Sequence, residues 1–360
     1  MRASLRLRIA VEQWALHVWY GQSLSARLLR LLLTPASVLF GLIIRQRNAR
    51  FDAESTGRGA GELPVVSVGN LTVGGTGKTP VASWVAMQLQ ARGGRPAIVL
   101  RGYGDDEWRV HALLTPGIPV FVAPVRQRGV EDARAAGCDC VVLDDAFQHR
   151  QVPRISDVVV VSADRWDGQV RLLPAGPYRE PLTALRRASV VIVTGKAVSE
   201  AQLAQVRTAL VPWVGGAAIV RVRLRPAALE PAVPGASGSR LPLDALSHGQ
   251  WMAVSAIGDP SAFEGQLRSR GARLVRHWRF PDHHPFTAEE ATALAAEAQG
   301  GMGVVCTLKD AVKLGPLWPR AAVPLWYVSQ TLEADRDNGI LERECDRVLA
   351  ARAVRTSPAG

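Results

Sequence analysis

Cysteine is scarce in this sequence, whose 360 residues include four: Cys138, Cys140, Cys306 and Cys345. Four scattered cysteines are too few for a disulfide framework, so we expect the protein to work in a reducing compartment. Cys138 and Cys140 are separated by one residue, but no second pair stands at the spacing of a zinc site. We therefore interpret these two residues as small side chains that lead into a buried strand.

Acidic side chains are almost absent from residues 1–50, which contain Glu12 and eight arginines. A long uninterrupted apolar run is missing as well: residues 31–44 give 14 residues that include Pro35, whereas a bilayer-spanning helix needs about 20. No small-residue cleavage site follows, so a signal peptide is not indicated. The mixture of arginine, leucine and aromatic residues is typical of a membrane interface. We expect residues 1–50 to form an interfacial, membrane-associated helical segment; the alternative is an amphipathic helix packed on the protein's own core.

Positive charge dominates the whole chain, with a formal net charge of +11 and a pI near 10.3. The partner is therefore expected to be acidic: nucleic acid, an anionic membrane surface or a phosphorylated substrate. Charge alone does not choose among these. The length and the hydrophobic content of 48% exclude wholesale disorder and allow two domains.

Continuous apolar, β-rich runs indicate the fold class. They occur at residues 97–100, 140–143, 157–162 and 189–194, with helical or irregular segments between them. This pattern is typical of an α/β fold in which a parallel sheet is buried on both faces. We expect an N-terminal segment at 1–50, a P-loop NTPase-type nucleotide-binding domain at 51–225, an inter-domain connection at 226–250, a second, smaller α/β lobe at 251–350 and a tail at 351–360.

A strand-to-helix turn ending in Gly77-Lys78-Thr79 carries the most specific chemistry. In such a turn, backbone N–H groups surround phosphate oxygens, the lysine reaches the β- and γ-phosphates, and the threonine faces Mg²⁺. Thr72 stands where the usual spacing has a glycine, and we expect Gly74 and Gly75 to supply the flexibility. The alternative is a glycine-rich turn without a ligand. The residues predicted to bind ATP or GTP are Thr72, Val73, Gly74, Gly75, Thr76, Gly77, Lys78 and Thr79.

Acidic residues follow another apolar run, at Asp144 and Asp145. Such a position lies at the carboxyl edge of a parallel sheet beside the phosphate loop, where an aspartate binds Mg²⁺ directly or through water. Helix capping would also explain one of the two. Gln148 and His149 follow directly and are expected to orient phosphate or water.

Two further polar loops are candidates for the same site. Residues 101–107 combine Arg101 with Asp106 and Glu107 just after a predicted strand. Residues 280–286 form a histidine and carboxylate cluster that fits a general base pair, a metal site or a surface turn. An exposed polar turn is the alternative for the first loop as well.

Several of these motifs together resemble the tetraacyldisaccharide 4′-kinase family of lipid A biosynthesis along nearly the whole chain. The similar segments are 68–79, 100–103, 105–107, 144–149, 172–181, 280–284 and 307–313. Three positions differ from the family pattern: Ala146 replaces glycine, Leu308 replaces glutamate and Thr194 replaces an asparagine that helps ligand binding. The segment between Tyr103 and Asp106 is also shorter than is usual in the family.

The resemblance implies transfer of the γ-phosphate of ATP to the 4′-hydroxyl of a tetraacyldisaccharide 1-phosphate. Lys78 would act on the β- and γ-phosphates, Asp106 with His283 would form the acid/base pair, and Mg²⁺ would bind to Thr79, Asp144 and Glu180. The remaining residues expected to contact substrate are Arg101, Tyr103, Glu107, Asp145, Gln148, His149 and Thr194. The resemblance also implies a monomer at the cytoplasmic face of the bacterial inner membrane, without a nucleic-acid partner.

Two alternatives stay open at the level of sequence. The first is a P-loop GTPase or metal-insertion ATPase, although the guanine-selecting Asn-Lys-x-Asp is absent and residues 307–310 resemble it only distantly. The second is a basic membrane-binding or nucleic-acid-binding protein that has lost catalysis. This second alternative leaves the Lys78, Asp144 and His283 motifs unexplained.

Overall fold

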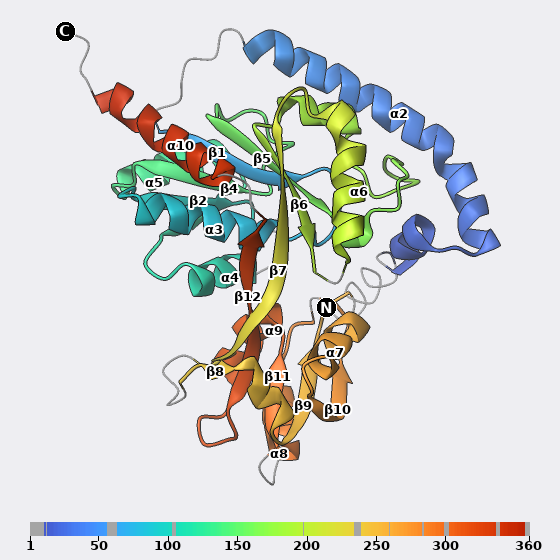
Figure 1. Ribbon diagram of the computed structural model, residues 1–360, viewed down its shortest axis with the longest axis vertical. Helices are drawn as coiled ribbons and strands as arrows, with labels where there is room; N and C mark the ends of the chain where they lie inside the picture. Colours follow the sequence, from blue (N-terminus) through green and yellow to red (C-terminus); the bar gives the residue numbers. More distant parts are fainter. Residues whose placement is uncertain are drawn as a thin grey trace. The chain divides into compact units, whose positions relative to one another are not determined.

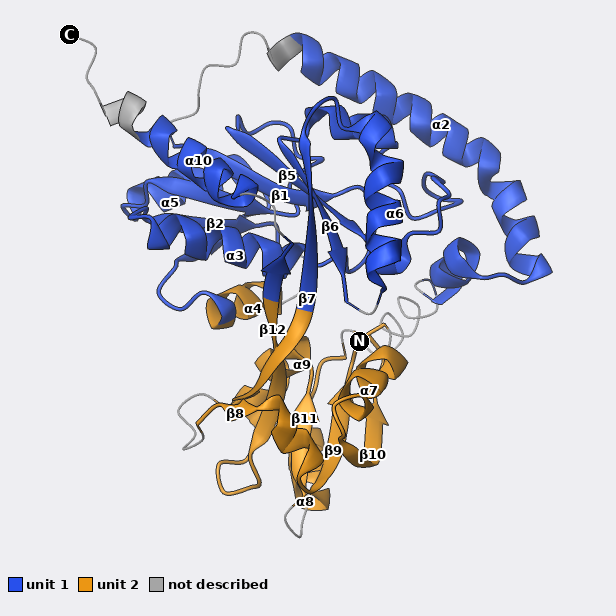
Figure 2. Cartoon of the chain, in the orientation of Figure 1, with its two compact units in different colours: residues 1–102, 114–224, 332–360 blue, residues 103–113, 225–331 orange. Residues whose placement is uncertain are grey.

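The fold is described from a computed structural model. It covers residues 11, 13–55, 63–102, 106–196, 198–233, 239–258, 260–282, 284–298, 302–335 and 339–356. The described chain divides into two compact units: residues 1–102, 114–224 and 332–360 form unit 1, and residues 103–113 and 225–331 form unit 2 (Figure 2).

A mostly parallel sheet flanked by helices forms unit 1, as the apolar runs predicted (Figure 1). The strand order is β7-β6-β5-β1-β4-β2-β3, and each neighbouring pair is parallel. The strands are β1 (Val65–Asn70), β2 (Pro96–Leu100), β3 (Val120–Val122), β4 (Cys140–Asp144), β5 (Ser156–Ser162), β6 (Val190–Gly195) and β7 (Ala218–Pro231).

Helices bury both faces of this sheet, and this explains its continuous apolar runs. Successive side chains of a strand point to opposite faces, so Val160 belongs to the core cluster beneath one helical layer and Val159 to the cluster beneath the other. The elements in these layers are α3 (Lys78–Ala91), α5 (Arg126–Ala135), α6 (Glu200–Leu210), α10 (Ile340–Thr356), η1 (Ala163–Arg165), η2 (Leu182–Arg187) and η3 (Val211–Trp213).

In unit 2 the strand order is β10-β9-β11-β12, each neighbouring pair is parallel, and β8 pairs antiparallel with β7. These strands are β8 (Leu241–Pro242), β9 (Gln250–Ser255), β10 (Arg273–Arg279), β11 (Gly303–Cys306) and β12 (Leu325–Ala334). Strands β7 and β12 each have residues in both units. The helices are α4 (Glu107–Leu114), η4 (Leu243–Ser247), α7 (Pro260–Arg268), α8 (Ala288–Glu297), α9 (Leu308–Leu314) and η5 (Gly315–Leu317).

The observed division differs from the expected domains in four places. Residues 226–250 are not a simple connection, because they contain the end of β7 together with β8 and η4. Residues 332–350 belong to unit 1, because Leu341 and Val348 of α10 are buried in the core cluster that contains α3. The expected tail at 351–360 begins as helix, since α10 continues to Thr356. Residues 103–113 join unit 2 and not the nucleotide-binding domain.

One long helix, α2 (Leu24–Ser55), dominates the N-terminal segment and continues through Pro35 (Figure 1). Within the described residues, it is the helix that by length and composition could cross a membrane; 11% of its most apolar window is buried. The helix extends into residues 51–55, which the sequence analysis assigned to the nucleotide-binding domain. Ser37 connects it to the rest of unit 1 by donating to the Leu172 carbonyl at 3.0 Å.

All four cysteines are buried and unpaired. Burial raises the pKa values of the thiols of Cys138 and Cys345, which keeps both protonated at neutral pH. The interpretation of Cys138 and Cys140 as small buried side chains is therefore confirmed. Cys140 belongs to β4 itself.

The buried centre of the unit 1 sheet gives a stability prediction. Ile192 of β6 has no exposed surface, so Ile192→Ala removes buried methyl groups and leaves a cavity. We expect the free energy of unfolding, measured by urea denaturation, to fall by about 2–5 kcal/mol. Val211→Ala is the matched control, because Val211 is 57% exposed. Equal losses for both variants would contradict the assignment of this core.

Candidate functional site

The parallel register of β1 and β4 brings the predicted nucleotide loop and the acidic pair together. Val68 of β1 is paired with Asp144 of β4, so both strands end at the same edge of the sheet. Gly69 allows this approach, because a Cβ at that position would lie 2.6 Å from Cβ of Phe147. The two motifs are therefore neighbours through strand pairing, although about 70 residues separate them in the sequence.

The glycine-rich turn presents the amino terminus of α3. Gly77 precedes the helix with a left-handed φ of 88°, and no side chain caps the helix there. The first N–H groups of a helix have no partner inside it, so an uncapped amino terminus suits a phosphate. A Cβ at Gly77 would lie 2.7 Å from Cδ1 of Leu224, which adds a packing reason for glycine.

Thr72 stands where the usual loop has a glycine, and the structure gives the reason. Thr72 forms an isolated antiparallel bridge with Tyr178, and the neighbouring Val73 N–H donates to the Pro177 carbonyl at 2.8 Å. The backbone is extended at this point, which a β-branched residue accepts readily. Gly74 instead has the positive φ, 105°, and lies against the guanidinium of Arg165.

Asp144 is almost fully buried and lies next to Thr79. One carboxylate oxygen of Asp144 accepts from the Asp145 N–H at 2.8 Å, and the other accepts from the Thr79 hydroxyl at 3.5 Å. A threonine hydroxyl with a nearby aspartate is the oxygen donor pair that P-loop proteins use for Mg²⁺. The residues present therefore fit this cation.

Asp145 is held between two cations. Its carboxylate lies 3.8 Å from Nζ of Lys78 and 2.7 Å from a guanidinium nitrogen of Arg179. Burial acts to raise the pKa of Asp145, but the charges of Lys78 and Arg179 outweigh burial and lower it. The carboxylate is therefore ionised at neutral pH and compensates the positive charge of the phosphate loop.

A polar network beneath the loop includes residues that the sequence predicted to touch substrate. The fully buried Asn70 donates to the Thr76 hydroxyl at 2.8 Å, and Gln148 donates to the Asn70 carbonyl at 2.8 Å. The hydroxyl of Thr194 donates to the Thr76 carbonyl at 2.9 Å. Gln148 and Thr194 therefore stabilise the backbone of residues 70–76 by hydrogen bonds to its carbonyl groups.

Sequence reasoning missed Asn70 and Arg179 as members of the site. Arg179 contacts the side chain of Asn70 as well as Asp145. Asn70 lies inside segment 68–79 and Arg179 inside segment 172–181, and both segments resemble the family. Their place in these segments is the sequence signal that could have identified them. Neither residue type has a specific role in a phosphate loop, so only their contacts identify them.

His149 lies among arginines. Burial first, and then the charges of Arg126, Arg154 and Arg101, lower its pKa to about 4. The imidazole is therefore neutral at pH 7 and can orient a ligand but supplies no positive charge. Arg101, which follows β2, is exposed at the same edge of the sheet.

Glu180 does not have the surroundings of a metal ligand. Its carboxylate has no exposed surface and accepts two hydrogen bonds from Arg187, at 3.1 and 3.2 Å. Asn48 of α2 donates to the same carboxylate at 2.6 Å. Because these donors occupy both oxygens, we withdraw Glu180 from the predicted metal site.

One of the two predicted acid/base residues, Asp106, belongs to unit 2. Asp106 is buried there, and its carboxylate pairs with Nζ of Lys313 at 3.3 Å. Glu107 is the first residue of α4. Tyr103 and His283 lie outside the described residues. His284 pairs with Glu290 at 3.0 Å, and the described part of the chain contains no group of three His, Cys, Asp or Glu side chains that could hold a metal.

Residues 29–349 match the model of a family described as tetraacyldisaccharide-1-P 4′-kinase. The chain is similar to the tetraacyldisaccharide 4′-kinases of Anaeromyxobacter sp. (strain Fw109-5), with 36% identity over 95% of this chain and 98% of the relative, and of Halorhodospira halophila, with 35% identity over 88% and 91%. The crystal structure of LpxK from Aquifex aeolicus in complex with ATP has a TM-score of 0.71 and 25% identity, covering 89% of this chain and 99% of that one.

The environment of His149 generates a pH prediction. The unfolded chain binds a proton at this residue near pH 6.5, whereas the folded chain does so only near pH 4. Its contribution to the free energy of unfolding is therefore fully present above pH 6.5 and is lost as the pH falls toward 4. We expect His149→Gln to flatten the pH dependence of stability across this window. A wild-type His149 that titrates near 6.5 by NMR would contradict the expectation.

Proposed function

The chain belongs to the tetraacyldisaccharide 4′-kinase family, and we propose that its phosphate loop and acidic pair transfer the γ-phosphate of ATP to the 4′-hydroxyl of a tetraacyldisaccharide 1-phosphate. The protein is thus an ATP-dependent phosphotransferase of lipid A biosynthesis that acts on an alcohol group. The observation that carries the proposed site is the contact of Lys78 with Asp145 at the amino terminus of α3.

ATP would bind with its phosphates over the amino terminus of α3. The N–H groups from Gly74 to Thr79 would donate to phosphate oxygens, and Lys78 would exchange its contact with Asp145 for the β- and γ-phosphates. Asp145 and Arg179 would remain paired at the rim of the site. Phosphoryl transfer needs positioning and charge compensation more than covalent chemistry, and these residues supply both.

Thr79 and Asp144 would hold Mg²⁺, which neutralises charge on the β- and γ-phosphates when it is bound. Mg²⁺ usually binds through one or two protein oxygens and completes its shell with water and phosphate. The hydroxyl and carboxylate, 3.5 Å apart, offer such a pair.

We propose that Asp106 and His283 form the acid/base pair that accepts the proton of the sugar hydroxyl. The buried ion pair of Asp106 with Lys313 supports an ionised carboxylate, which is the form that a base requires. Tyr103, Glu107, Arg101 and His149 remain proposed contacts of the acceptor.

A recess in unit 1 offers a route by which a lipid acceptor would approach the loop. Its walls include Tyr20 of the N-terminal segment, Thr72 of the loop, Trp166 and Tyr178. Aromatic rings with polar edges suit a molecule that carries both sugar and acyl groups.

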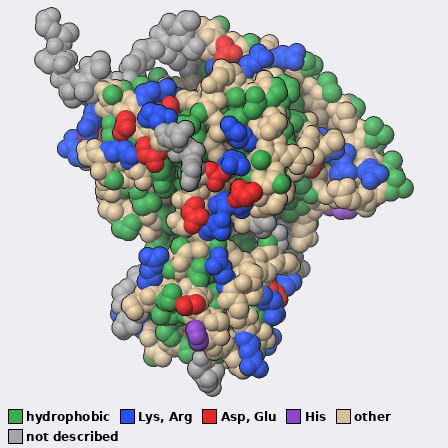
Figure 3. Space-filling view, in the orientation of Figure 1, with side chains coloured by type: hydrophobic (Ala, Val, Ile, Leu, Met, Phe, Trp, Pro, Cys, Tyr) green, Lys and Arg blue, Asp and Glu red, His purple; other side chains and the backbone are tan. Residues whose placement is uncertain are grey.

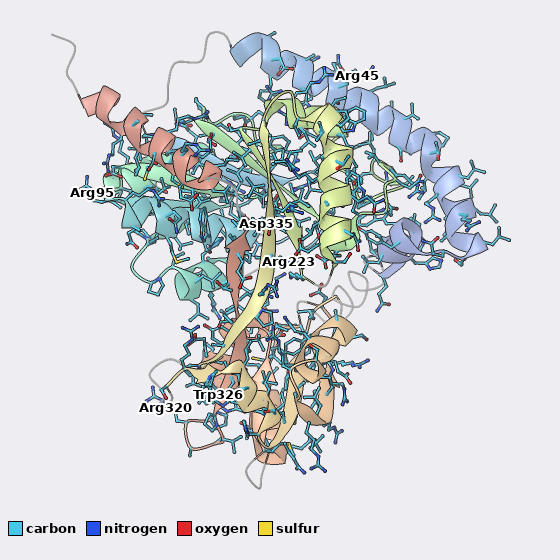
Figure 4. The ribbon with its side chains drawn as sticks, viewed as in Figure 1. Arg45, Arg95, Arg223, Arg320, Trp326 and Asp335 are labelled. Carbon is cyan, nitrogen blue, oxygen red and sulfur yellow. The ribbon has the colours of Figure 1, made fainter. Side chains whose placement is uncertain are left out.

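Helix α2 would hold the enzyme at the cytoplasmic face of the inner membrane. Its exposed apolar residues include Leu31, Leu32, Leu39 and Leu42, and Figure 3 shows hydrophobic side chains along this helix. Arg45 is exposed on the same helix (Figure 4). Apolar side chains beside arginines favour an anionic lipid surface. We propose that the enzyme acts there as a monomer on a lipid that stays in the bilayer.

The kinase reaction gives the first functional prediction. Labelled γ-phosphate should move from Mg·ATP to tetraacyldisaccharide 1-phosphate in mixed micelles with wild-type protein. Lys78→Ala should lower kcat about 100- to 1,000-fold, because a cation that stabilises transition-state charge is lost. The exposed Lys196 provides a control, Lys196→Ala, that should retain activity.

A wild type that binds ATP but forms no phosphorylated lipid would overturn the proposed acceptor. His283→Ala and Asp106→Asn should reduce kcat with little change in the KM for ATP, since both would act on the acceptor hydroxyl. Unchanged kcat in both variants would remove them from the mechanism.

Membrane docking gives a separate prediction. The double variant Leu32→Glu, Leu39→Glu changes side chains that are 75% and 60% exposed, so the fold should persist. Burying each leucine in lipid contributes about 1.5–3 kcal/mol, so affinity for phosphatidylglycerol vesicles should fall at least tenfold. Flotation of both proteins with vesicles measures this. Equal flotation would show that α2 does not contact lipid.

A further inference from the structure

Glu180 is a fully buried carboxylate to which no step of the proposed reaction gives a role. An uncompensated buried charge is costly, so such a group persists only when several donors surround it. Arg187 donates to both of its oxygens, at 3.1 and 3.2 Å, and fixes the side chain from η2. These two bonds leave one side of the carboxylate facing α2.

Two residues of α2 complete the shell around Glu180. Asn48 donates at 2.6 Å, and a guanidinium nitrogen of Arg47 lies 4.0 Å from the other oxygen. Arg150 fixes the same turn of α2, because it donates to the Asn48 carbonyl at 3.0 Å and pairs with Asp52 at 2.6 Å. The helix with the exposed leucines is thus bonded to a buried charge of unit 1.

The next residue in the chain reaches the phosphate site. Arg179 donates to Asp145 at 2.7 Å, and Asp145 lies 3.8 Å from Lys78. The Arg179 N–H also donates to the Leu71 carbonyl at 2.7 Å, which holds this segment against the end of β1. Three polar contacts therefore lead from α2 to the lysine of the loop: Asn48 with Glu180, Arg179 with Asp145, and Asp145 with Lys78.

We propose that Asn48 and Glu180 are positioning residues through which α2 sets the orientation of Arg179, and with it Asp145 and Lys78. The inference rests on the proposed function, since it assigns a role in the kinase reaction to the membrane-contacting helix. When α2 settles on a lipid surface, the Asn48 contact keeps Glu180 in place, and the adjacent Arg179 keeps its hold on Asp145. Catalysis then depends on this contact in addition to membrane binding itself.

Asn48→Ala tests the inference directly, and Ser37→Ala is the matched control. Ser37 is a second contact of α2 with unit 1, since it donates to the Leu172 carbonyl and accepts from the Ala175 N–H, both at 3.0 Å. It has no bond to Glu180. We expect Asn48→Ala to lower kcat about tenfold, because a small misplacement of positioned groups costs this much or more. The KM for ATP and vesicle affinity should change little, and Ser37→Ala should leave kcat unchanged.

Glu180→Gln is the second variant, because it keeps an oxygen for Asn48 but removes the charge that Arg187 requires. It should lower kcat in the same way, again without loss of vesicle binding. An unchanged kcat in Asn48→Ala would overturn the proposal. A kcat loss that is matched by Ser37→Ala, or by weaker vesicle binding, would also overturn it, because general helix packing or docking would then explain the effect.

Amide hydrogen exchange provides a readout that needs no kinase activity. Adding phosphatidylglycerol vesicles should slow exchange of the amides of residues 178–180, which Ser37 does not contact, in the wild type and in Ser37→Ala, but not in Asn48→Ala. Unaltered exchange in the wild type would refute the coupling even if lipid is phosphorylated. Slowed exchange in a wild type that forms no lipid product would instead support the coupling and refute the proposed acceptor.

Discussion

The parallel pairing of β1 with β4 is the constraint on which the site depends. Parallel strands end at the same edge of a sheet, so the register that opposes Val68 to Asp144 places the glycine turn and the acidic pair beside each other. The pairing requires strands that are buried on both faces, and it requires Gly69 where Phe147 approaches. Without this register, the sheet would not bring Lys78 and Asp145 within contact distance of each other.

Charge compensation then determines how the site is held before nucleotide binds. The amino terminus of α3, Lys78 and Arg179 concentrate positive charge, and Asp145 is the anion that keeps them together. A triphosphate is negatively charged, as Asp145 is, so its oxygens can replace this carboxylate as the partner of Lys78. The site is thus preorganised for a triphosphate, which reduces the rearrangement that phosphoryl transfer requires.

Helix α2 carries two kinds of side chain: exposed leucines, and polar residues that are hydrogen-bonded to unit 1. Leu32 and Leu39 have no partner surface among the described residues, whereas Asn48 and Ser37 are bonded to unit 1. The proposed membrane docking and the attachment to the catalytic unit therefore use different residues of the same helix. This separation would give an enzyme with an insoluble acceptor a means to link its position at the membrane to its active site.

Local sequence determined the elements whose signals are short range. The glycine turn at residues 74–79, the acids at the end of β4 and the apolar strands were all predicted, because each depends on a few adjacent residues. Tertiary structure decided what depends on distant partners. Glu180 was predicted to bind a metal, but Arg187 and Asn48 enclose it; α10 joined unit 1 because α3 offers it an apolar surface. The sequence shows these side chains but not which of them come into contact, because burial and charge pairing arise only when the chain has folded.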